Sequence, residues 1–355
     1  MNNHLEQVLS DGIQRLIGDA LRITPKNPKQ SAFLLQAAAA ARKAARRRHA
    51  FEQAGEHIPP ILIASITGSC NLRCAGCYAR AGHVCHDSQE LPLIMWERVF
   101  ADAEALGVSV ILLAGGEPFL RYDVLEAAAG HKKLLFPVFT NGTLLGDRAM
   151  GLLDSHRSLI PMVSIEGGEA ATDARRGQGV YKQTVETMRR LRQSGLFFGA
   201  SVTVTSDNLD VVTDSVYMDS LEKMGCKAVL FVEYVPVERP ELALGGDDRD
   251  KLAARVREAR TRQKGMIVIS FPGDEAELGG CLAAGRGFFH ISAAGGAEPC
   301  PFSPYSDVNL RNVSLREALK SPLFARLREE GVLTAAHTGG CVLFEQKEMV
   351  SEFVS

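Results

Sequence analysis

Three cysteines, Cys70, Cys74 and Cys77, lie within eight residues, with three and then two residues between them. Structural zinc usually takes four ligands, commonly from two C-x2–4-C pairs, and ferredoxin clusters need a fourth cysteine at other spacings. The triplet matches neither pattern, although Cys85 or His83 would complete a zinc site as a fourth ligand. Three thiolates on a short loop instead suit three irons of a four-iron cubane, and the fourth iron is then open to a small molecule.

The spacing C-x3-C-x2-C after an apolar segment resembles the radical S-adenosylmethionine (radical SAM) superfamily. In that family the amino and carboxylate groups of S-adenosylmethionine chelate the open iron, so the resemblance implies a SAM-binding 4Fe-4S cluster on Cys70, Cys74 and Cys77. The family usually has an aromatic residue directly before the third cysteine, where this chain has Gly76. We therefore expect another side chain to cover the adenine, and Tyr78 is the first candidate.

A second motif, Gly115-Gly116-Glu117-Pro118, follows the next apolar segment. Paired glycines let a backbone approach a bound group closely, and Glu117 offers a carboxylate to an ammonium. The motif resembles the GGEP element of the family, which holds the amino group of S-adenosylmethionine, so all four residues are predicted to bind the cofactor. Taken alone, the same letters also describe an ordinary turn between a strand and a helix.

Three further predicted strands end in residues suited to the same site. Asn141 follows the third strand within Thr140-Asn141-Gly142-Thr143, where a plain turn is the alternative. Ser164 and Glu166 end the fourth strand, and the resemblance implies that they reach the ribose and the methionine carboxylate. Val235 follows the sixth strand and is expected at the adenine. Its neighbours Glu233 and Tyr234 are expected to face the substrate.

The C-terminal part of the chain contains a second cysteine set. Cys281 and Cys300 flank two short segments, 287–292 and 297–299, around Ala294-Gly295-Gly296, which predicts a β-hairpin. The arrangement C-x13-G-x4-C resembles the start of the auxiliary-cluster domains called SPASM or, when shorter, Twitch. Cys341 supplies a third thiol, so the resemblance implies a second iron–sulfur cluster on these three cysteines.

The remaining SPASM cysteines are missing, and a full two-cluster SPASM domain is therefore not expected. His337, a carboxylate, Cys226 or the substrate would have to complete the second cluster. A structural zinc site is the alternative for the three cysteines, and ordinary buried thiols are another.

The elements that must position these residues follow a regular pattern. From residue 61 onward, short apolar strands alternate with helices of roughly twelve residues, which predicts a parallel α/β sheet with right-handed crossovers. The predicted strands are 61–66, 108–114, 134–140, 159–165, 197–204 and 228–234. Six such units predict a partial (β/α)6 TIM-like barrel. In parallel sheets functional residues gather at the carboxyl ends of the strands, and the motifs above all fall there.

The domain prediction has four parts. Residues 1–58 are expected to form a helical extension, 59–272 the barrel, 273–345 a small SPASM- or Twitch-like domain with the hairpin, and 346–355 a tail. Apolar residues at three- and four-residue steps predict a first helix. A second helix is expected to begin near Ser31 and to end in five basic residues, Arg42, Lys43, Arg46, Arg47 and Arg48. We interpret its basic end as a solvated face, with contact to an anionic membrane surface or an acidic or lipid substrate as the alternative.

The composition excludes several classes of protein. The chain has 355 residues, 46% of them hydrophobic, and a formal charge of −2, so it can bury a large core and carries no global charge that favours nucleic acid. Eight cysteines without a secretory signal favour a reducing compartment. No run of 18 apolar residues is present. We expect a cytoplasmic protein whose only membrane contact would be through the basic helix.

The resemblance implies an enzyme that reductively cleaves S-adenosylmethionine to a 5′-deoxyadenosyl radical and removes hydrogen from an unactivated carbon. We expect a small-molecule or lipid-linked substrate and an oxidation or bond formation assisted by the second cluster. The electron would come from a reductant such as flavodoxin or ferredoxin. Peptide or protein modification is the alternative, and a non-enzymatic iron–sulfur carrier is an alternative of another class.

Overall fold

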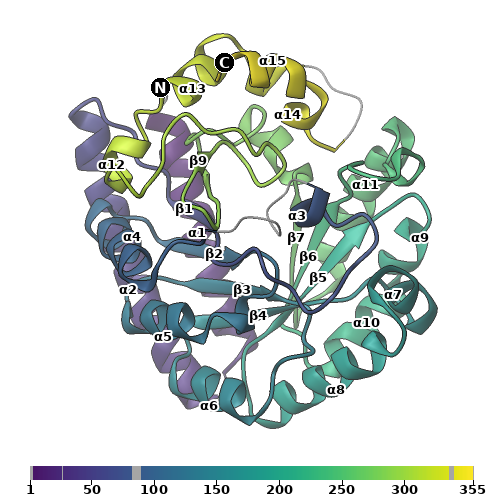
Figure 1. Cartoon of the computed structure of the whole chain (residues 1–355). Coiled ribbons are helices and arrows are strands. Elements are labelled where there is room, and N and C mark those ends of the chain that lie inside the picture. The colour runs from purple at the N-terminus through teal and green to yellow at the C-terminus, as the bar shows by residue number, and fades with distance from the viewer. Residues whose placement is uncertain (1–2, 26, 82–88, 336–339, 355) are drawn as a thin grey trace.

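The computed structural model describes residues 3–25, 27–81, 89–335 and 340–354. Its strands form one sheet in the order β7-β6-β5-β4-β3-β2-β1-β8-β9 (Figure 1). The first seven strands are parallel neighbours in chain order. They are β1 (Ile61–Ser65), β2 (Val110–Ala114), β3 (Phe136–Thr140), β4 (Leu159–Ser164), β5 (Gly199–Val204), β6 (Ala228–Glu233) and β7 (Ile267–Phe271). This arrangement confirms the predicted α/β fold of a partial barrel.

Helices connect the parallel strands and cover the outer face of the sheet (Figure 1). Those after β1 to β3 are α3 (Tyr78–Ala81), α4 (Leu93–Leu106), α5 (Tyr122–Gly130) and α6 (Asp147–Ser155). Those after β4 to β6 are α7 (Glu169–Arg176), α8 (Val180–Gln193), α9 (Leu209–Val212), α10 (Ser215–Met224) and α11 (Gly246–Arg262). The pattern in the sequence did not predict β7 or α7. Both are short, and α7 follows Gly167 and Gly168 without any apolar stripe of its own.

Alternation along the strands divides their side chains between two environments. In β1, Leu62 and Ala64 are fully buried beneath the outer helices, whereas Ile61 and Ile63 face the interior of the barrel, where a cavity lies. The register of β1 with β2 pairs Ile61 with Val110 and Ser65 with Ala114. The carboxyl ends of the parallel strands therefore meet at one edge, and the predicted site residues gather there.

The N-terminal helices α1 (Asn3–Ile23) and α2 (Pro28–Gln53) pack as a hairpin against the other end of the barrel. Ile13 and Ile17 of α1 and Leu34 of α2 form an apolar cluster there. This cluster contacts residues at or next to the first positions of five strands, Ile61, Val110, Leu135, Ile160 and Ile267. The helical hairpin thus covers the amino-terminal end of the barrel and forms its floor.

One buried arginine fastens this hairpin to the barrel. Arg48 is 1% exposed, and its guanidinium donates to Ser10 Oγ at 2.6 Å, Ser109 Oγ at 3.0 Å, Glu6 Oε1 at 3.2 Å and the Gly107 carbonyl. Burial lowers the pKa of Arg48, and the Glu6 carboxylate offsets part of that effect. A buried cation needs such partners because an unpaired one is costly to desolvate.

The basic end of α2 was predicted to be solvated, and this prediction is wrong for part of that end. Arg48 is buried, and Arg47 donates to the carbonyls of Glu104 and Ala105 in the last turn of α4, where free carbonyls attract a cation. Arg47 is nevertheless exposed, and Arg42, Lys43 and Arg46 are exposed as well, as expected. Membrane contact through these exposed side chains stays a prediction.

The predicted hairpin near the C-terminus is confirmed. Strands β8 (His290–Ile291) and β9 (Ala297–Glu298) pair antiparallel, and β8 extends the sheet by pairing parallel with β1. His290 is buried between Ser65 Oγ at 2.8 Å and Glu298 Oε2 at 2.7 Å, which links the two strands of the hairpin to β1. In the described part of the C-terminal segment, four short helices follow across the top of Figure 1, α12 (Leu315–Ala318), α13 (Pro322–Glu329), α14 (Val342–Glu345) and α15 (Lys347–Glu352).

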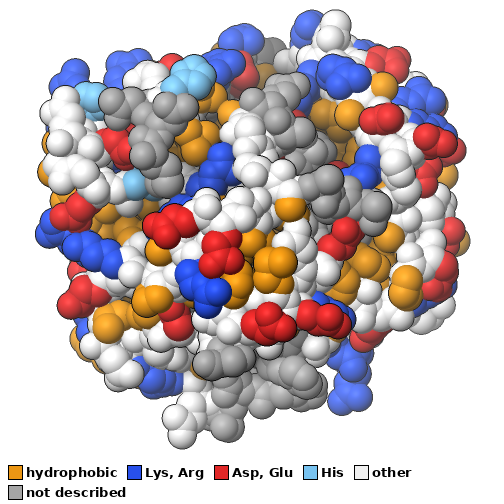
Figure 2. All heavy atoms as spheres, turned by 90° about the horizontal axis from the view of Figure 1, so that it is seen from above, with side chains coloured by type: hydrophobic (Ala, Val, Ile, Leu, Met, Phe, Trp, Pro, Cys, Tyr) orange, Lys and Arg blue, Asp and Glu red, His pale blue; other side chains and the backbone are white. Residues whose placement is uncertain are grey.

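The surface charge bears on the expectation about nucleic acid, and the helices bear on the expectation about membrane spans. Acidic and basic side chains are interspersed over the face shown in Figure 2, with hydrophobic side chains between them. This face therefore has no continuous basic patch of the kind that binds nucleic acid. Among the described residues, no helix is both long enough and apolar enough to cross a membrane.

Candidate functional site

The cysteine loop that follows β1 is fastened to the turn that follows β2. The Gly116 N–H donates to the Thr67 carbonyl and the Glu117 N–H to the Ser69 carbonyl, each at 2.8 Å. A Cβ on Gly116 would lie 2.0 Å from the Ser69 oxygen, and one on Gly115 would lie 2.3 Å from the Thr67 oxygen. Only glycine allows this approach. The glycine pair therefore positions the backbone from which the three cysteines project.

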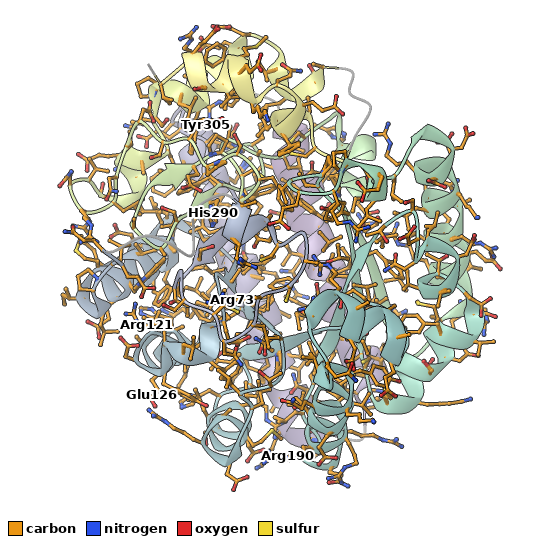
Figure 3. The ribbon with its side chains drawn as sticks, turned by 45° about the vertical axis from the view of Figure 1, so that its right-hand side comes forward. Arg73, Arg121, Glu126, Arg190, His290 and Tyr305 are labelled. Atoms are coloured by element: carbon orange, nitrogen blue, oxygen red, sulfur yellow. The ribbon has the colours of Figure 1, made fainter. Side chains whose placement is uncertain are left out.

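Other strand ends hold the same loop from the opposite side. The Ala75 N–H donates to the Arg175 carbonyl at 2.8 Å, and the Gly76 N–H donates to Glu238 Oε2 at 2.8 Å. Asn71 donates to Thr143 Oγ1 at 2.8 Å. In Figure 3 Arg73 lies on this loop in the middle of the molecule, with His290 above it toward the C-terminal segment. Segments after four strands thus fix the loop before any ligand binds.

Cys70, Cys74 and Cys77 are all partly exposed, and all three line a cavity of about 590 Å³. Burial raises the pKa of Cys70 and of Cys74, although Arg176 and Arg175 partly counteract this for Cys74. Thiols of this kind ionise readily only when a cation compensates the charge, as an iron–sulfur cluster does. The donor set therefore fits a cluster bound through three thiolates.

Most of the predicted cofactor-binding residues line the same cavity. The set comprises Tyr78, Gly115, Gly116, Asn141, Ser164 and Val235. They come from the cysteine loop and from the ends of β2, β3, β4 and β6, so the sequence prediction that these motifs converge is consistent with the geometry. Their individual roles stay predictions.

Glu117 and Pro118 do not line the cavity, and the contact of this carboxylate with an ammonium stays a prediction. Glu117 is fully buried. Its carboxylate accepts from Thr140 Oγ1 at 2.8 Å, from the Asn141 N–H at 2.8 Å and from the Phe119 N–H at 3.1 Å. The turn directs this side chain into the protein, where it joins the end of β2 to the end of β3. Glu117 thus supports the site from behind.

Asn141, in turn, connects the end of β3 to the cysteine loop. Its Nδ2 donates to Asn71 Oδ1 at 2.9 Å and lies 4.0 Å from Cys70 Sγ. Its Oδ1 accepts from the Thr143 N–H at 2.9 Å. The plain-turn alternative therefore accounts for only part of its contacts, because its amide also touches the residue beside Cys70.

Glu166 binds two arginines that sequence reasoning missed. The Glu166 carboxylate is 2% exposed and receives Arg176 Nη2 at 2.6 Å and Arg175 Nη1 at 2.8 Å. Burial alone would raise the pKa of Glu166, but the two guanidinium groups overcome this and lower it. Arg175 and Arg176 line the cavity, whereas Glu166 does not. Glu166 therefore holds these two arginines at the cavity, and its own contact with the cofactor stays a prediction. The sequence did contain a signal for this pairing, because two adjacent arginines follow the carboxylate at the end of the strand.

The space beside Gly76 is occupied by Tyr234 rather than by Tyr78. Tyr234 follows β6, and its Oη would lie 2.6 Å from a Cβ on Gly76. Tyr78 packs edge-on against Phe302, with ring centroids 4.9 Å apart. Both tyrosines and Phe302 line the cavity. An aromatic ring thus stands next to the third cysteine, but a distant part of the sequence supplies it.

The second cysteine set also comes together. Cys300 and Cys341 are buried, and their two sulfurs lie close enough to interact with each other. Cys281 is close enough to both for their charges to interact, and burial strongly raises the pKa of Cys281 and of Cys300. Among the described residues, no three cysteine, histidine, aspartate or glutamate side chains are grouped to hold one metal ion. Both the second iron–sulfur cluster and the zinc alternative for these cysteines therefore stay predictions.

Four residues considered as additional ligands have different outcomes. Cys85, His83 and His337 lie outside the described residues. Cys226 is fully buried in the main core just before the start of β6, at the opposite end of the sheet, and burial raises its pKa to about 12. Cys226 is therefore wrong as a candidate ligand for the second cluster.

Comparisons with known proteins agree with this geometry. Residues 64–224 match the family model described as "Radical SAM superfamily". An AdoMet-dependent heme synthase from Methanosarcina barkeri is 26% identical over 82% of this chain and 90% of its own length. A PqqA peptide cyclase from a Methylobacterium species is 29% identical over 67% of this chain and 66% of its own length. Residues 64–224 of the chain form a radical SAM domain.

The fold of this chain also resembles a solved structure. Streptococcus suis SuiB, crystallised with its precursor peptide SuiA, superimposes with a TM-score of 0.67 at 17% identity, over 85% of this chain and 72% of SuiB. At this identity the likeness shows the fold alone. With a radical SAM domain, the chain uses S-adenosylmethionine and a 4Fe-4S cluster.

Proposed function

We propose that Cys70, Cys74 and Cys77 hold the SAM-binding 4Fe-4S cluster and that Cys281, Cys300 and Cys341 hold a second iron–sulfur cluster. The observation that carries the proposal is the cavity, which the first three cysteines line directly. Leu282, next to Cys281, lines the same cavity, as do Pro301 and Phe302 after Cys300. A substrate in this space would therefore lie between the two cysteine sets.

The bound cluster and S-adenosylmethionine supply one-electron chemistry that activates an inert C–H bond, which no side chain supplies. The residues of the chain bind and orient the reacting groups. Gly115 and Gly116 bring the backbone close to the cysteine loop, and Arg175 and Arg176 place positive charge beside Cys74. The electron is expected to come from an external reductant such as flavodoxin or ferredoxin.

The interior of the barrel suits radical chemistry because it keeps water away. Aliphatic and aromatic side chains from β1 to β4, β6 and β7 make most of the cavity wall, among them Ile63, Leu112, Phe139, Met162 and Ile269, whereas β5 contributes Ser201 and Thr203. Such a wall excludes water and offers few polar groups to compete for a substrate. The described polar residues near the cysteines are concentrated at the strand ends.

We propose a peptide or protein side chain as the substrate, with oxidation or bond formation as the reaction. Relatives named PqqA peptide cyclase and sporulation killing factor maturation protein support this proposal. The SuiB structure contains a precursor peptide. These names favour the peptide alternative over the small-molecule or lipid-linked substrate that the sequence led us to expect.

A small, largely apolar molecule is the second candidate. The heme synthase match spans 82% of this chain, and the apolar cavity would suit such a molecule. A non-enzymatic carrier gains no support, since a carrier would not need the strand-end residues that converge on the cavity.

The first experiment mixes anaerobically reconstituted protein with dithionite and S-adenosylmethionine and measures 5′-deoxyadenosine. We expect the product from the unaltered chain and from the control Cys226→Ala, and none when Cys70, Cys74 and Cys77 are all replaced by Ala. Full cleavage by the triple variant would refute the first cluster assignment.

A second experiment identifies the substrate class. Deuterium-labelled extract is separated into a peptide fraction and a small-molecule fraction, and each is scored for deuterium carried into 5′-deoxyadenosine. Transfer from the peptide fraction supports the proposal. Transfer from the small-molecule fraction alone would replace it with the second candidate.

A further inference from the structure

The second cysteine set has three thiols, and a four-iron cluster needs one more ligand. The chain between β7 and Cys281 contains the short 3₁₀ helix η3 (Gly273–Leu278). Glu275 lies on this helix and is 6% exposed. It also lines the cavity that the first three cysteines line. Its carboxylate is therefore placed between the cavity and the second cysteine set.

The contacts of Glu275 point toward the cysteines. The carboxylate lies close enough to the Cys281 thiol and to the Cys341 sulfur to interact with both. The backbone of Leu282 also interacts with this carboxylate and offsets part of the rise in its pKa that burial causes. These contacts hold the carboxylate beside two of the three sulfurs.

One oxygen of this carboxylate lacks a partner. Glu275 Oε1 is buried and has no hydrogen-bond partner among the described residues. Leaving such an atom unsatisfied costs about 1–3 kcal/mol, so a buried orphan of this kind calls for an explanation. A metal atom bound at this oxygen would supply one.

Glu233 offers an instructive comparison. It is also buried, lines the same cavity and has an oxygen, Oε2, without a hydrogen-bond partner in the described part of the chain. Its side chain lies beside Gly340, where a Cβ would be 3.2 Å from Glu233 Oε2, and the interaction that shifts its pKa besides burial is with Arg249. Of the two carboxylates, Glu275 is the one in contact with a cysteine.

We propose that Glu275 is the fourth protein ligand of the second iron–sulfur cluster. This inference rests on the proposed function, because it requires a cluster on Cys281, Cys300 and Cys341. A carboxylate is a harder and more weakly bound ligand for iron in a sulfide cluster than a thiolate. The iron held by Glu275 would therefore face the cavity with an exchangeable ligand. A substrate group could then displace the carboxylate.

The test uses the full chain with Cys70, Cys74 and Cys77 replaced by Ala, so that only the second cluster contributes signals. Iron and sulfide content, Mössbauer spectra and electron paramagnetic resonance are measured after anaerobic reconstitution. In this background we expect about four irons per chain. We expect Glu275→Gln to lose one iron on mild oxidation and to give a three-iron signal. Glu275→Cys should retain all the irons and have a lower reduction potential.

The control is Glu233→Gln, which removes a similar buried carboxylate without touching a cysteine. It should retain the iron content and spectra of the background protein, and circular dichroism should show that each variant is folded. Unchanged spectra in both Glu275 variants, loss of iron from Glu233→Gln instead, or nitrogen coupling from a histidine ligand would each overturn the assignment of Glu275. A background protein without iron would overturn the second cluster itself, and the first cluster assignment would be unaffected.

Discussion

Tyr234 lies against Gly76, so close that a Cβ on Gly76 would be 2.6 Å from the tyrosine Oη. The two residues come from the segment after β6 and from the cysteine loop. The Arg239 N–H donates to the Tyr234 hydroxyl at 3.2 Å, which holds the ring in this position. Gly76 stands where the family usually has an aromatic residue, and Tyr234, which follows β6, fills the space beside it. A larger side chain at position 76 would therefore collide with the Tyr234 ring.

This relationship predicts that Gly76→Ala is harmful although the change is small. Gly76 has φ of +63°, and the added methyl group would also meet Tyr234. We expect the free energy of unfolding to fall by about 1–3 kcal/mol, measured by urea denaturation, together with weaker binding of S-adenosylmethionine. Gly55→Ala is the control, since Gly55 has φ of +80° but open space around it. Equal losses for both variants would contradict the proposed clash, and Gly76→Ala with Tyr234→Ala should recover part of the loss.

A second prediction concerns Glu166→Gln, which leaves Arg175 and Arg176 without their carboxylate. We expect a loss of about 3 kcal/mol in the free energy of unfolding at neutral pH, because a buried charge loses its partner. The control Glu169→Gln removes only an exposed pair with Lys182 and should cost about 0–1 kcal/mol.

The stability difference between the unaltered protein and Glu166→Gln should depend on pH, and the direction of this dependence follows from the pKa of Glu166. The arginines hold the pKa of Glu166 in the folded chain below its ordinary value of 4.5. The stabilisation is therefore present above pH 4.5 and is lost as the pH falls through the lower folded value. The difference between the unaltered protein and Glu166→Gln should shrink on acidification. A difference that stays constant from pH 7 to the acid range would contradict the ion-pair explanation.

A third prediction concerns the attachment of the N-terminal hairpin. Arg48→Met would leave Glu6 buried without its cation, and we expect it to lower the free energy of unfolding by about 3 kcal/mol. Hydrogen exchange in α1 should accelerate more than exchange in the central strands. Arg42→Met, on the exposed face of the same helix, should change stability by less than about 0.5 kcal/mol. If both variants unfold at the same urea concentration, Arg48 does not fasten the hairpin.

The sequence predicted those parts of the fold that depend on local pattern. Strands β1 to β6 begin and end within two residues of their predicted bounds, because buried parallel strands appear as short apolar runs. The hairpin around Gly295 followed from its turn residues. The convergence of Asn141, Ser164 and Val235 followed from the rule that strand ends share one edge.

Side-chain direction within a turn was beyond the reach of the same patterns. Nothing in Gly-Gly-Glu-Pro says that Glu117 turns inward toward Thr140, because that depends on the neighbouring strand. The pairing of Glu166 with Arg176 depends on α7, whose polar sequence has no apolar stripe to reveal it. Arg48 looked like one of five solvated cations until its distant partners Glu6 and Ser10 were in place.

The helical hairpin α1–α2 serves two purposes with one surface. Ile13 and Ile17 cover the strand starts and, together with Leu16, also form the far wall of the cavity. A substitution on this surface that reshapes the space for a substrate would at the same time change the packing that stabilises the barrel. Substrate range and folding stability would therefore change together in this protein, and variants selected for a larger substrate would be expected to need a compensating change elsewhere in the hairpin.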